Sequence, residues 1–451
     1  MSVDISTLNY PIKDHLRTQI LIPEDHFLIH LASVIPWKEY AELAIADLYK
    51  DRRRSGRKLN LRLHLGAFIL QAQFGWTDRE LEENLNYYAP AKVFCGIVGK
   101  SYDHSAFVKF RGRISEETAK KFNTLILKVA HKKGFTGTQF MDIDSTVQEA
   151  NIEYPSDIRM MQSVFRKGIK LLNGLVEAGS TKAKGLVEQF DVKQASKDFK
   201  SYFFAKKNQD GFELKRKIFS KTHKLAKKIV SAVDKVKSTI KSYDLPWNYK
   251  RDLDQLTDVA PELLGQIAHF IRHQEVAPEK LLSLHAGEVK CISKGKVGKP
   301  YEFGRRFFAS RLPGNYVMAF TGESCDLEDA HSMDIALKDY QDIFKQFPDS
   351  VAGDQGFWSR HNLKACKGIT EIGITPRGHK NWKVSEDKVE ELTTRRSKVE
   401  PIIGHLKRRG MGKSRMKSDQ TTKLKGQLSA LSLNLVRLAR DLRGGDLKWA
   451  G

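Results

Sequence analysis

The 451-residue sequence lacks three features that define large protein classes. It has no run of 18 consecutive apolar residues, so a membrane span is not expected. Its first ten residues, MSVDISTLNY, contain neither a basic nor an apolar segment, so no secretory signal is expected. Its four cysteines are far apart and form no C-x-x-C pair. They are therefore predicted to be reduced thiols in a cytoplasmic protein, rather than a zinc site or a disulfide framework.

Acidic residues are scarce relative to basic ones. There are 54 Asp and Glu against 77 Lys and Arg, which gives a formal charge of +23. Residues 193–241 hold 15 basic and 4 acidic residues, and residues 395–420 hold 9 and 2. Such basic stretches are either solvated lysine-rich helix faces or sites of contact with phosphates. The charge favours a polyanionic partner, and nucleic acid is the commonest one. Because 40% of the residues are hydrophobic, a chain that is mainly disordered is excluded.

Apolar residues at helical spacing predict an all-helical domain over residues 1–135. Thr77 and Glu80 have the spacing of a capping box at a helix start. In the short helix expected at residues 104–114, Phe107 and Phe110 share one face. The expected helices span residues 26–49, 59–74, 104–114 and 116–131.

Three basic residues of that short helix, Lys109, Arg111 and Arg113, lie largely off the aromatic face. They are the candidate DNA contacts of this domain, because short helices with a basic face suit a helix-turn-helix-like module. A plain helical bundle that holds subunits together is the alternative.

The pattern changes after residue 135, and residues 136–451 are predicted to form an α/β domain. Pro313 and Gly314 predict a turn that joins two strands into a hairpin. Basic helices fill an insertion at about residues 155–285, and two further helices are expected at residues 329–347 and from about Glu400. The expected strands span residues 138–144, 288–293, 305–310, 316–320, 350–353 and 369–374.

Three carboxylates occupy positions suited to metal chemistry. Asp144 ends one strand, Asp354 follows another, and Glu400 opens a basic helix. Ligands of α/β sheets bind at strand ends, and converging carboxylates there can hold Mg²⁺ ions that promote phosphodiester displacement. Lys407 lies two helical turns after Glu400, so the two residues share a face. Arg396 lies one turn before Glu400. Pro401 implies either that the helix starts near Glu400 or that it is kinked there.

These residues carry a resemblance to the DDE transposases of bacterial insertion sequences. The segment RRSKVEPIIGHLK resembles their C-terminal signature of tyrosine, two residues, arginine, three residues, glutamate, six residues and lysine. Arg396, Glu400 and Lys407 match it, and Thr393 stands in the tyrosine's place. The segments MDIDSTVQEANIEYP and VAGDQGFWS resemble the two aspartate blocks. Residues 61–114 resemble the InsH-type N-terminal domain of such enzymes.

The resemblance implies an RNase H-like catalytic domain in which Asp144, Asp354 and Glu400 bind two Mg²⁺ or Mn²⁺ ions. It implies that Arg396 and Lys407 contact DNA near the scissile phosphate. The implied partners are double-stranded transposon ends and target DNA, held by a homodimer, with no membrane and no nucleotide involved. The gap of 210 residues between the aspartates must hold an insertion. A catalytically inactive or domesticated descendant, either a DNA-binding protein or a nuclease, is the alternative.

Several neighbouring residues compete for roles. Asp142 lies two residues before Asp144 on the same strand face, but Asp144 is favoured because Ser145 and Thr146 follow it as in the aspartate block. Phe357 and Trp358 either pack in the core or stack on a base. Glu149 and Asp157 are expected to be solvated or capping carboxylates, and His405 to be structural. The segment KGKVGKP lacks the spacing of a phosphate-binding loop.

Overall fold

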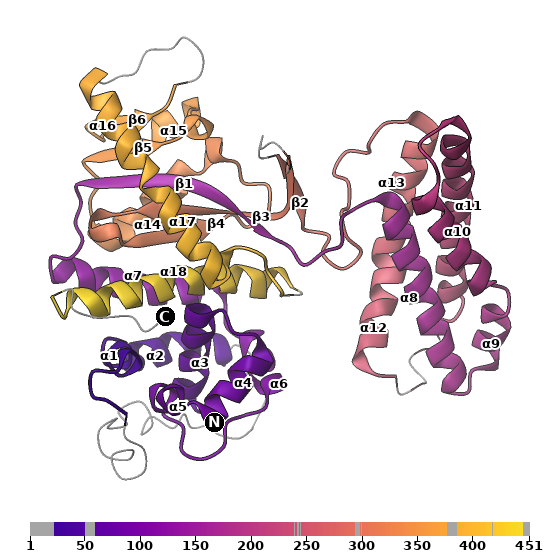
Figure 1. Cartoon of the computed structure of the whole chain (residues 1–451), viewed down its shortest axis with the longest axis horizontal. Helices are drawn as coiled ribbons and strands as arrows, with labels where there is room; N and C mark the ends of the chain where they lie inside the picture. Colours follow the sequence, from indigo (N-terminus) through magenta and orange to yellow (C-terminus); the bar gives the residue numbers. More distant parts are fainter. Residues whose placement is uncertain are drawn as a thin grey trace. The chain divides into compact units, whose positions relative to one another are not determined.

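The computed structural model describes residues 22–49, 59–238, 240, 243, 245–293, 298, 300–376, 386–416 and 418–444. The chain divides into two compact units (Figure 1). The core unit combines residues 1–151 with residues 292–451, and the insertion unit comprises residues 152–291. Within the described residues, no helix has the length and apolar character needed to cross a membrane.

The N-terminal part of the core unit is helical. Pro36, which has no N–H to donate, divides the helix expected at residues 26–49 into two. The capping box at Thr77 is confirmed, because its hydroxyl accepts from Glu80 N and its own N–H donates to the Glu80 carboxylate. The helices are α1 (Phe27–Ser33), α2 (Trp37–Leu48), α3 (Leu61–Phe74), α4 (Asp78–Tyr87), α5 (Ala89–Cys95), α6 (His104–Arg111) and α7 (Glu116–Lys132).

A mixed sheet follows, in the order β2-β3-β1-β5-β6, with β4 also paired to β3. Strands β1, β3 and β4 are antiparallel, whereas β5 and β6 run parallel to β1. The hairpin predicted around Pro313 and Gly314 is confirmed as the β3–β4 pair. The strands are β1 (Phe140–Glu149), β2 (Lys290–Ser293), β3 (Tyr301–Arg311), β4 (Val317–Thr321), β5 (Ser350–Gly353) and β6 (Glu371–Ile374).

Helices cover both faces of this sheet. Phe307 and Ala309 of β3 pack against Ile402 and Leu406 of α17 (Val399–Leu406) on one face, together with residues of α18 (Asp419–Asp441). Residues that pair across two strands point to the same face. Asp144, the partner of Ala309, therefore points to the α17 side. The other face packs against α7 and α14 (Met333–Phe344). The short helix α15 (Arg360–Ala365) follows β5, and α16 (Glu386–Ser397) precedes α17.

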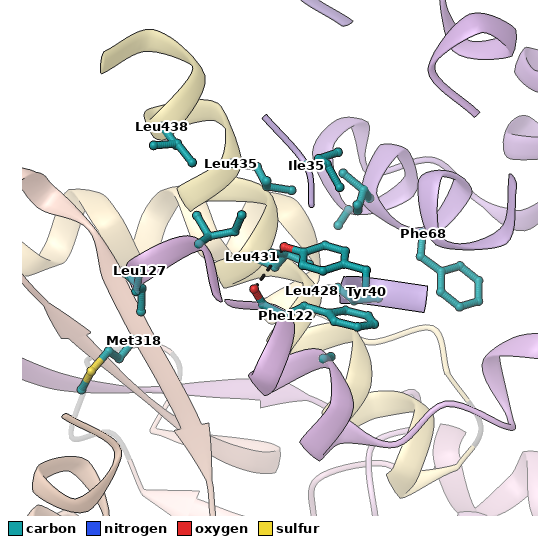
Figure 2. Close-up of a cluster of buried hydrophobic side chains, with 14 of the residues drawn as sticks. Ile35, Tyr40, Phe68, Phe122, Leu127, Met318, Leu428, Leu431, Leu435 and Leu438 are labelled. Atoms are coloured by element: carbon teal, nitrogen blue, oxygen red, sulfur yellow. Dashed lines mark hydrogen bonds between the residues drawn. The ribbon is translucent and has the colours of Figure 1, made fainter. Parts of the chain in front are cut away.

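The N-terminal helices share their hydrophobic core with the sheet and with α18. In Figure 2, Tyr40 stacks on Phe122 of α7 beside Leu428 and Leu431 of α18. The Tyr40 hydroxyl donates to the Phe122 carbonyl at 3.1 Å. Helix α18 lies between these helices and the sheet (Figure 1). The core unit thus includes residues on both sides of residue 135, and α18 buries apolar surface of the first helices.

The insertion unit has a hydrophobic core of its own. Helix α8 packs closely on α11, since a Cβ on Gly168 would lie 2.3 Å from Ile229 Cγ1. The last helix of the unit ends at His273, before the end of the helical insertion predicted at about residue 285. The elements are α8 (Asp157–Glu177), α9 (Thr181–Val187), α10 (Val192–Phe204), α11 (Gln209–Asp234), α12 (Trp247–Asp254), the π-helical turn η3 (Gln255–Val259) and α13 (Ala260–His273).

Candidate functional site

Two of the predicted carboxylates lie side by side at the centre of the sheet. Strands β1 and β5 are parallel, and Asp142 is the partner of Ala352. Asp144 and Asp354 each lie two residues further along the chain, and Asp354 keeps an extended backbone. Adjacent strands are about 4.8 Å apart, so the two backbones place the aspartates as neighbours. Both side chains are half-buried.

The third carboxylate, Glu400, lies in the first turn of α17, which contacts β1 and β3. Helix α16 ends at Ser397, and α17 begins at Val399 after a turn at Lys398. The structure therefore has a break one residue before the α17 start, and Arg396 lies on the preceding helix. Val399 and Ile402 form the buried face of α17, whereas Glu400 is exposed.

The segment that carries Glu400 is anchored to β1 on both sides of Asp144. Before Glu400, Arg395 Nε of α16 donates to the Asp142 carboxylate at 2.8 Å. After Glu400, Glu149 N donates to Gly412 O at 2.9 Å, and Ser414 N donates to Glu149 O at 2.7 Å. Gln148 adds a side-chain bond to Gly410 O at 2.9 Å. The helix is thus fixed along the strand that presents Asp144.

Asp142 is the centre of the first anchor. Its carboxylate is fully buried and accepts from Arg311 of β3 at 2.6 Å as well as from Arg395. Burial raises the pKa of the Asp142 carboxyl above its ordinary value, while Arg395 and Arg311 act in the opposite direction. Both guanidiniums also lie over the Phe140 ring, at 4.7 Å and 4.8 Å. Because both arginines bond to its oxygens, Asp142 has a structural role and joins β3 and α16 to β1. We call Asp142, Arg311 and Arg395 the clamp.

The predicted triad has a different environment. Asp144 accepts from Ser145 N at 2.7 Å, and Asp354 accepts from Gly356 N at 2.8 Å. Among the described residues, no hydrogen bond or ion pair engages the Glu400 carboxylate. The oxygens of the three groups do not all lie within 4.8 Å of one another. Three carboxylates from two strands and a helix are nonetheless the hard oxygen donors that Mg²⁺ takes.

Two cationic side chains flank Glu400. Arg396 is half-buried, and its Nε is a buried donor with no hydrogen-bond partner among the described residues. Lys407 is half-buried at the start of the π-helical turn η7 (Lys407–Met411). An unpaired buried donor costs free energy, so a ligand that accepts a hydrogen bond from Arg396 would remove that cost.

The expectation that Arg111 belongs to an exposed basic face is wrong. Arg111 is 4% exposed and pairs with Asp78 of α4, and it donates to Gln71 at 2.9 Å. Although burial raises the pKa of Asp78, the bonds from Arg111 and Gln71 hold it below its usual range. Arg113 is exposed but donates to Leu48 O at 2.7 Å. Lys109 is exposed, as expected for a residue off the aromatic face.

Among the described residues, one group of potential metal ligands consists of Glu82, Asp103 and His104, whose ligand atoms lie within 4.8 Å of one another. This group has a structural explanation. Asp103 caps α6, and Glu82 accepts from both the backbone N and the ring Nδ1 of His104. The bonds fasten α6 to α4.

The remaining candidates divide between core and surface. Phe357 is fully buried, and Trp358 packs against the same core. Asp157 forms an ion pair with Lys280 at 2.7 Å within the insertion unit. His405 is exposed, and its Nδ1 lies 3.0 Å from an Arg408 nitrogen.

Comparisons with known proteins bear on the first part of the chain. Residues 16–113 match the model of a family described as Transposase domain (DUF772). The match supports a transposase family. It covers helices α1 to α6, and so includes Arg111 at the end of α6. No curated protein and no solved structure gives a significant match.

Proposed function

We propose that the protein is a DDE transposase with an RNase H-like catalytic core. It would bind the terminal inverted repeats of an insertion sequence, hydrolyse phosphodiester bonds at the ends and join the 3′-hydroxyls to target DNA. The family match supports the transposase assignment. The two-sided anchoring of the Glu400 segment to β1 is the observation that carries the site assignment.

In this proposal Asp144, Asp354 and Glu400 hold two Mg²⁺ or Mn²⁺ ions. Such ions activate the attacking oxygen and stabilise the leaving oxygen of an in-line displacement. Their placement agrees with the resemblance, in which two aspartates lie on strands and the glutamate lies on a later helix.

Arg396 and Lys407 would position the DNA. The unpaired Nε of Arg396 can donate to a phosphate oxygen, and the Lys407 ammonium can neutralise a neighbouring phosphate. Catalysis of this kind consists of positioning and charge neutralisation, without a covalent protein intermediate. Two ends must be brought together, and a homodimer on double-stranded DNA would do so.

The test is an assay of cleavage and joining on a DNA fragment that carries the element's end, with Mg²⁺ or Mn²⁺. We expect Glu400→Gln to abolish both reactions while DNA binding persists. Glu390→Gln, which removes an exposed carboxylate of α16, is the matched control and should retain activity. Cleavage by Glu400→Gln at the parent rate would refute the assignment of Glu400. Equal activity of the parent without divalent metal would refute the two-metal mechanism.

A further inference from the structure

The connection between α10 and α11 exposes large apolar side chains. We call residues 203–214 the hairpin tip. Phe204, at the end of α10, is 85% exposed, and Phe212, in the first turns of α11, is 62% exposed. Phe203 and Leu214 are 43% and 44% exposed. Helices α10 and α11 pack against each other and are joined by residues 205–208, so these four residues lie at the same end of the helix pair. An exposed cluster of this kind indicates an interaction site.

The backbone of the hairpin tip is tightly built. Asn208 caps α11 by accepting from Gly211 N at 3.0 Å. A Cβ on Gly211 would lie 2.0 Å from Lys206 O, so the turn closes directly on the helix start. Arg159 of α8 lies over the Phe203 ring at 5.4 Å and supports the tip from inside the unit. Phe204 and Phe212 are therefore presented on a fixed support, which lowers the entropy cost of binding.

Cations surround the hairpin tip. Residues 200–217 contain six Lys or Arg and two acidic residues. The whole insertion unit has 26 basic and 17 acidic residues, a net charge of +9, whereas residues 193–241 alone have +11. The rest of the unit is thus close to neutral. Exposed basic residues continue along α11 from the tip, at Arg216, Lys217, Lys221 and Lys224.

Exposed aromatic rings amid exposed lysines fit a partner with flat apolar surfaces and regular negative charge. DNA has both, in its bases and its phosphates. Apolar side chains that insert between base steps, and aromatic side chains that stack on unpaired bases, are known modes of DNA binding. A protein partner would have to supply a carboxylate for each lysine that it covered.

We propose that Phe204 and Phe212 stack against DNA bases while the surrounding lysines contact the phosphates. The proposal rests on the proposed function, in which DNA is the substrate. It adds a base-contacting element in the insertion unit, far along the chain from the predicted carboxylates.

The test measures binding of the full-length chain to a labelled end fragment over a series of salt concentrations. We expect Phe204→Ala and Phe212→Ala each to weaken binding about 5- to 100-fold at every salt concentration. The slope of log affinity against log salt should stay unchanged, because no phosphate contact is lost. Lys217→Ala should instead make that slope shallower by about one unit, because one phosphate contact is lost.

Two variants control for folding and for apolar exposure. Phe204→Trp should restore affinity, because a larger ring can stack. Val276→Ala removes an exposed apolar residue elsewhere in the unit and should leave binding unchanged. Parent-like affinity of both Phe→Ala variants would overturn the proposal and leave the transposase proposal standing. Loss of self-association, or of binding to phosphatidylserine vesicles, with unchanged DNA affinity would also overturn it. Failure of the parent to bind DNA would overturn the proposed function itself.

Discussion

Asp142 and Asp144 lie two residues apart on β1, but we expect substitution by asparagine to affect different properties. At position 142 it should lower stability, and at position 144 it should abolish activity. Asp142→Asn would remove the buried charge between Arg311 and Arg395, whose side chains are only 8% and 13% exposed. Breaking a buried ion pair by removing one partner costs about 3 to 5 kcal/mol. We therefore expect Asp142→Asn to lower the free energy of unfolding by that amount. Asp144→Asn should change it by less than about 1 kcal/mol, since its side chain is only half-buried and the side-chain oxygen of asparagine can still accept from Ser145 N.

Denaturant titration measures these free energies from the transition midpoint and slope. The cleavage assay supplies the second measurement: Asp144→Asn should be inactive although it is stable. A double-mutant cycle of Asp142→Asn with Arg395→Gln adds an internal check. The two effects should be non-additive by about 0.5 to 3 kcal/mol if the residues form one clamp. If Asp142→Asn were as stable as the parent but inactive, Asp142 would be a site carboxylate and the clamp would be wrong.

Three further substitutions probe the core unit. Arg111→Ala should lower the free energy of unfolding by about 2 to 3 kcal/mol, because Asp78 loses its charged partner. Denaturant titration measures this change, and unchanged stability with weakened DNA binding would contradict the prediction. Gly426→Ala should lower the free energy of unfolding by about 1 to 3 kcal/mol, because its Cβ would lie 2.2 Å from the Phe307 ring. A calorimetric melting temperature at or above that of the parent would contradict this packing argument. Burial lowers the pKa of His64 to about 4 from 6.5, so the unfolded chain binds the extra proton first as the pH falls. Between pH 6.5 and pH 4 the parent should lose about 3 kcal/mol more stability than His64→Gln, and parallel pH profiles would refute a neutral buried ring.

Local signals predicted much of the fold. The capping box at Thr77, the turn at Pro313 and Gly314, and strand β5 are each determined by a few adjacent residues, and the structure has them where the sequence predicts. Strand β1 is longer than predicted and extends to Glu149, because residues 145–149 find partners in β3.

Long-range pairing accounts for what the sequence did not reveal. Arg395 and Asp142 are 253 residues apart, so no spacing rule joins them. The burial of Arg111 depends on Asp78 and Gln71, which belong to two other helices. The sequence has two adjacent arginines, Arg395 and Arg396, and the family signature explains only Arg396. The unexplained Arg395 was the one sequence signal that pointed to the clamp. The roles of Asp144, Asp354 and Glu400 stay predictions, supported by their placement on β1, after β5 and on α17.

The place where the insertion unit leaves the sheet has a consequence for folding. Residues 152–291 are inserted between β1 and β3, whose pairing resumes in register, with Glu149 opposite Gly304 and Ala150 N bonded to Phe303 O at 2.8 Å. The central antiparallel pair must therefore close a very long loop. If the insertion unit folds first and brings its ends together, the effective loop shortens from about 150 to about 15 residues. The entropy of closure is then smaller by about 2 kcal/mol. The unit that binds the polyanion in our proposal would in this way also assist assembly of the sheet.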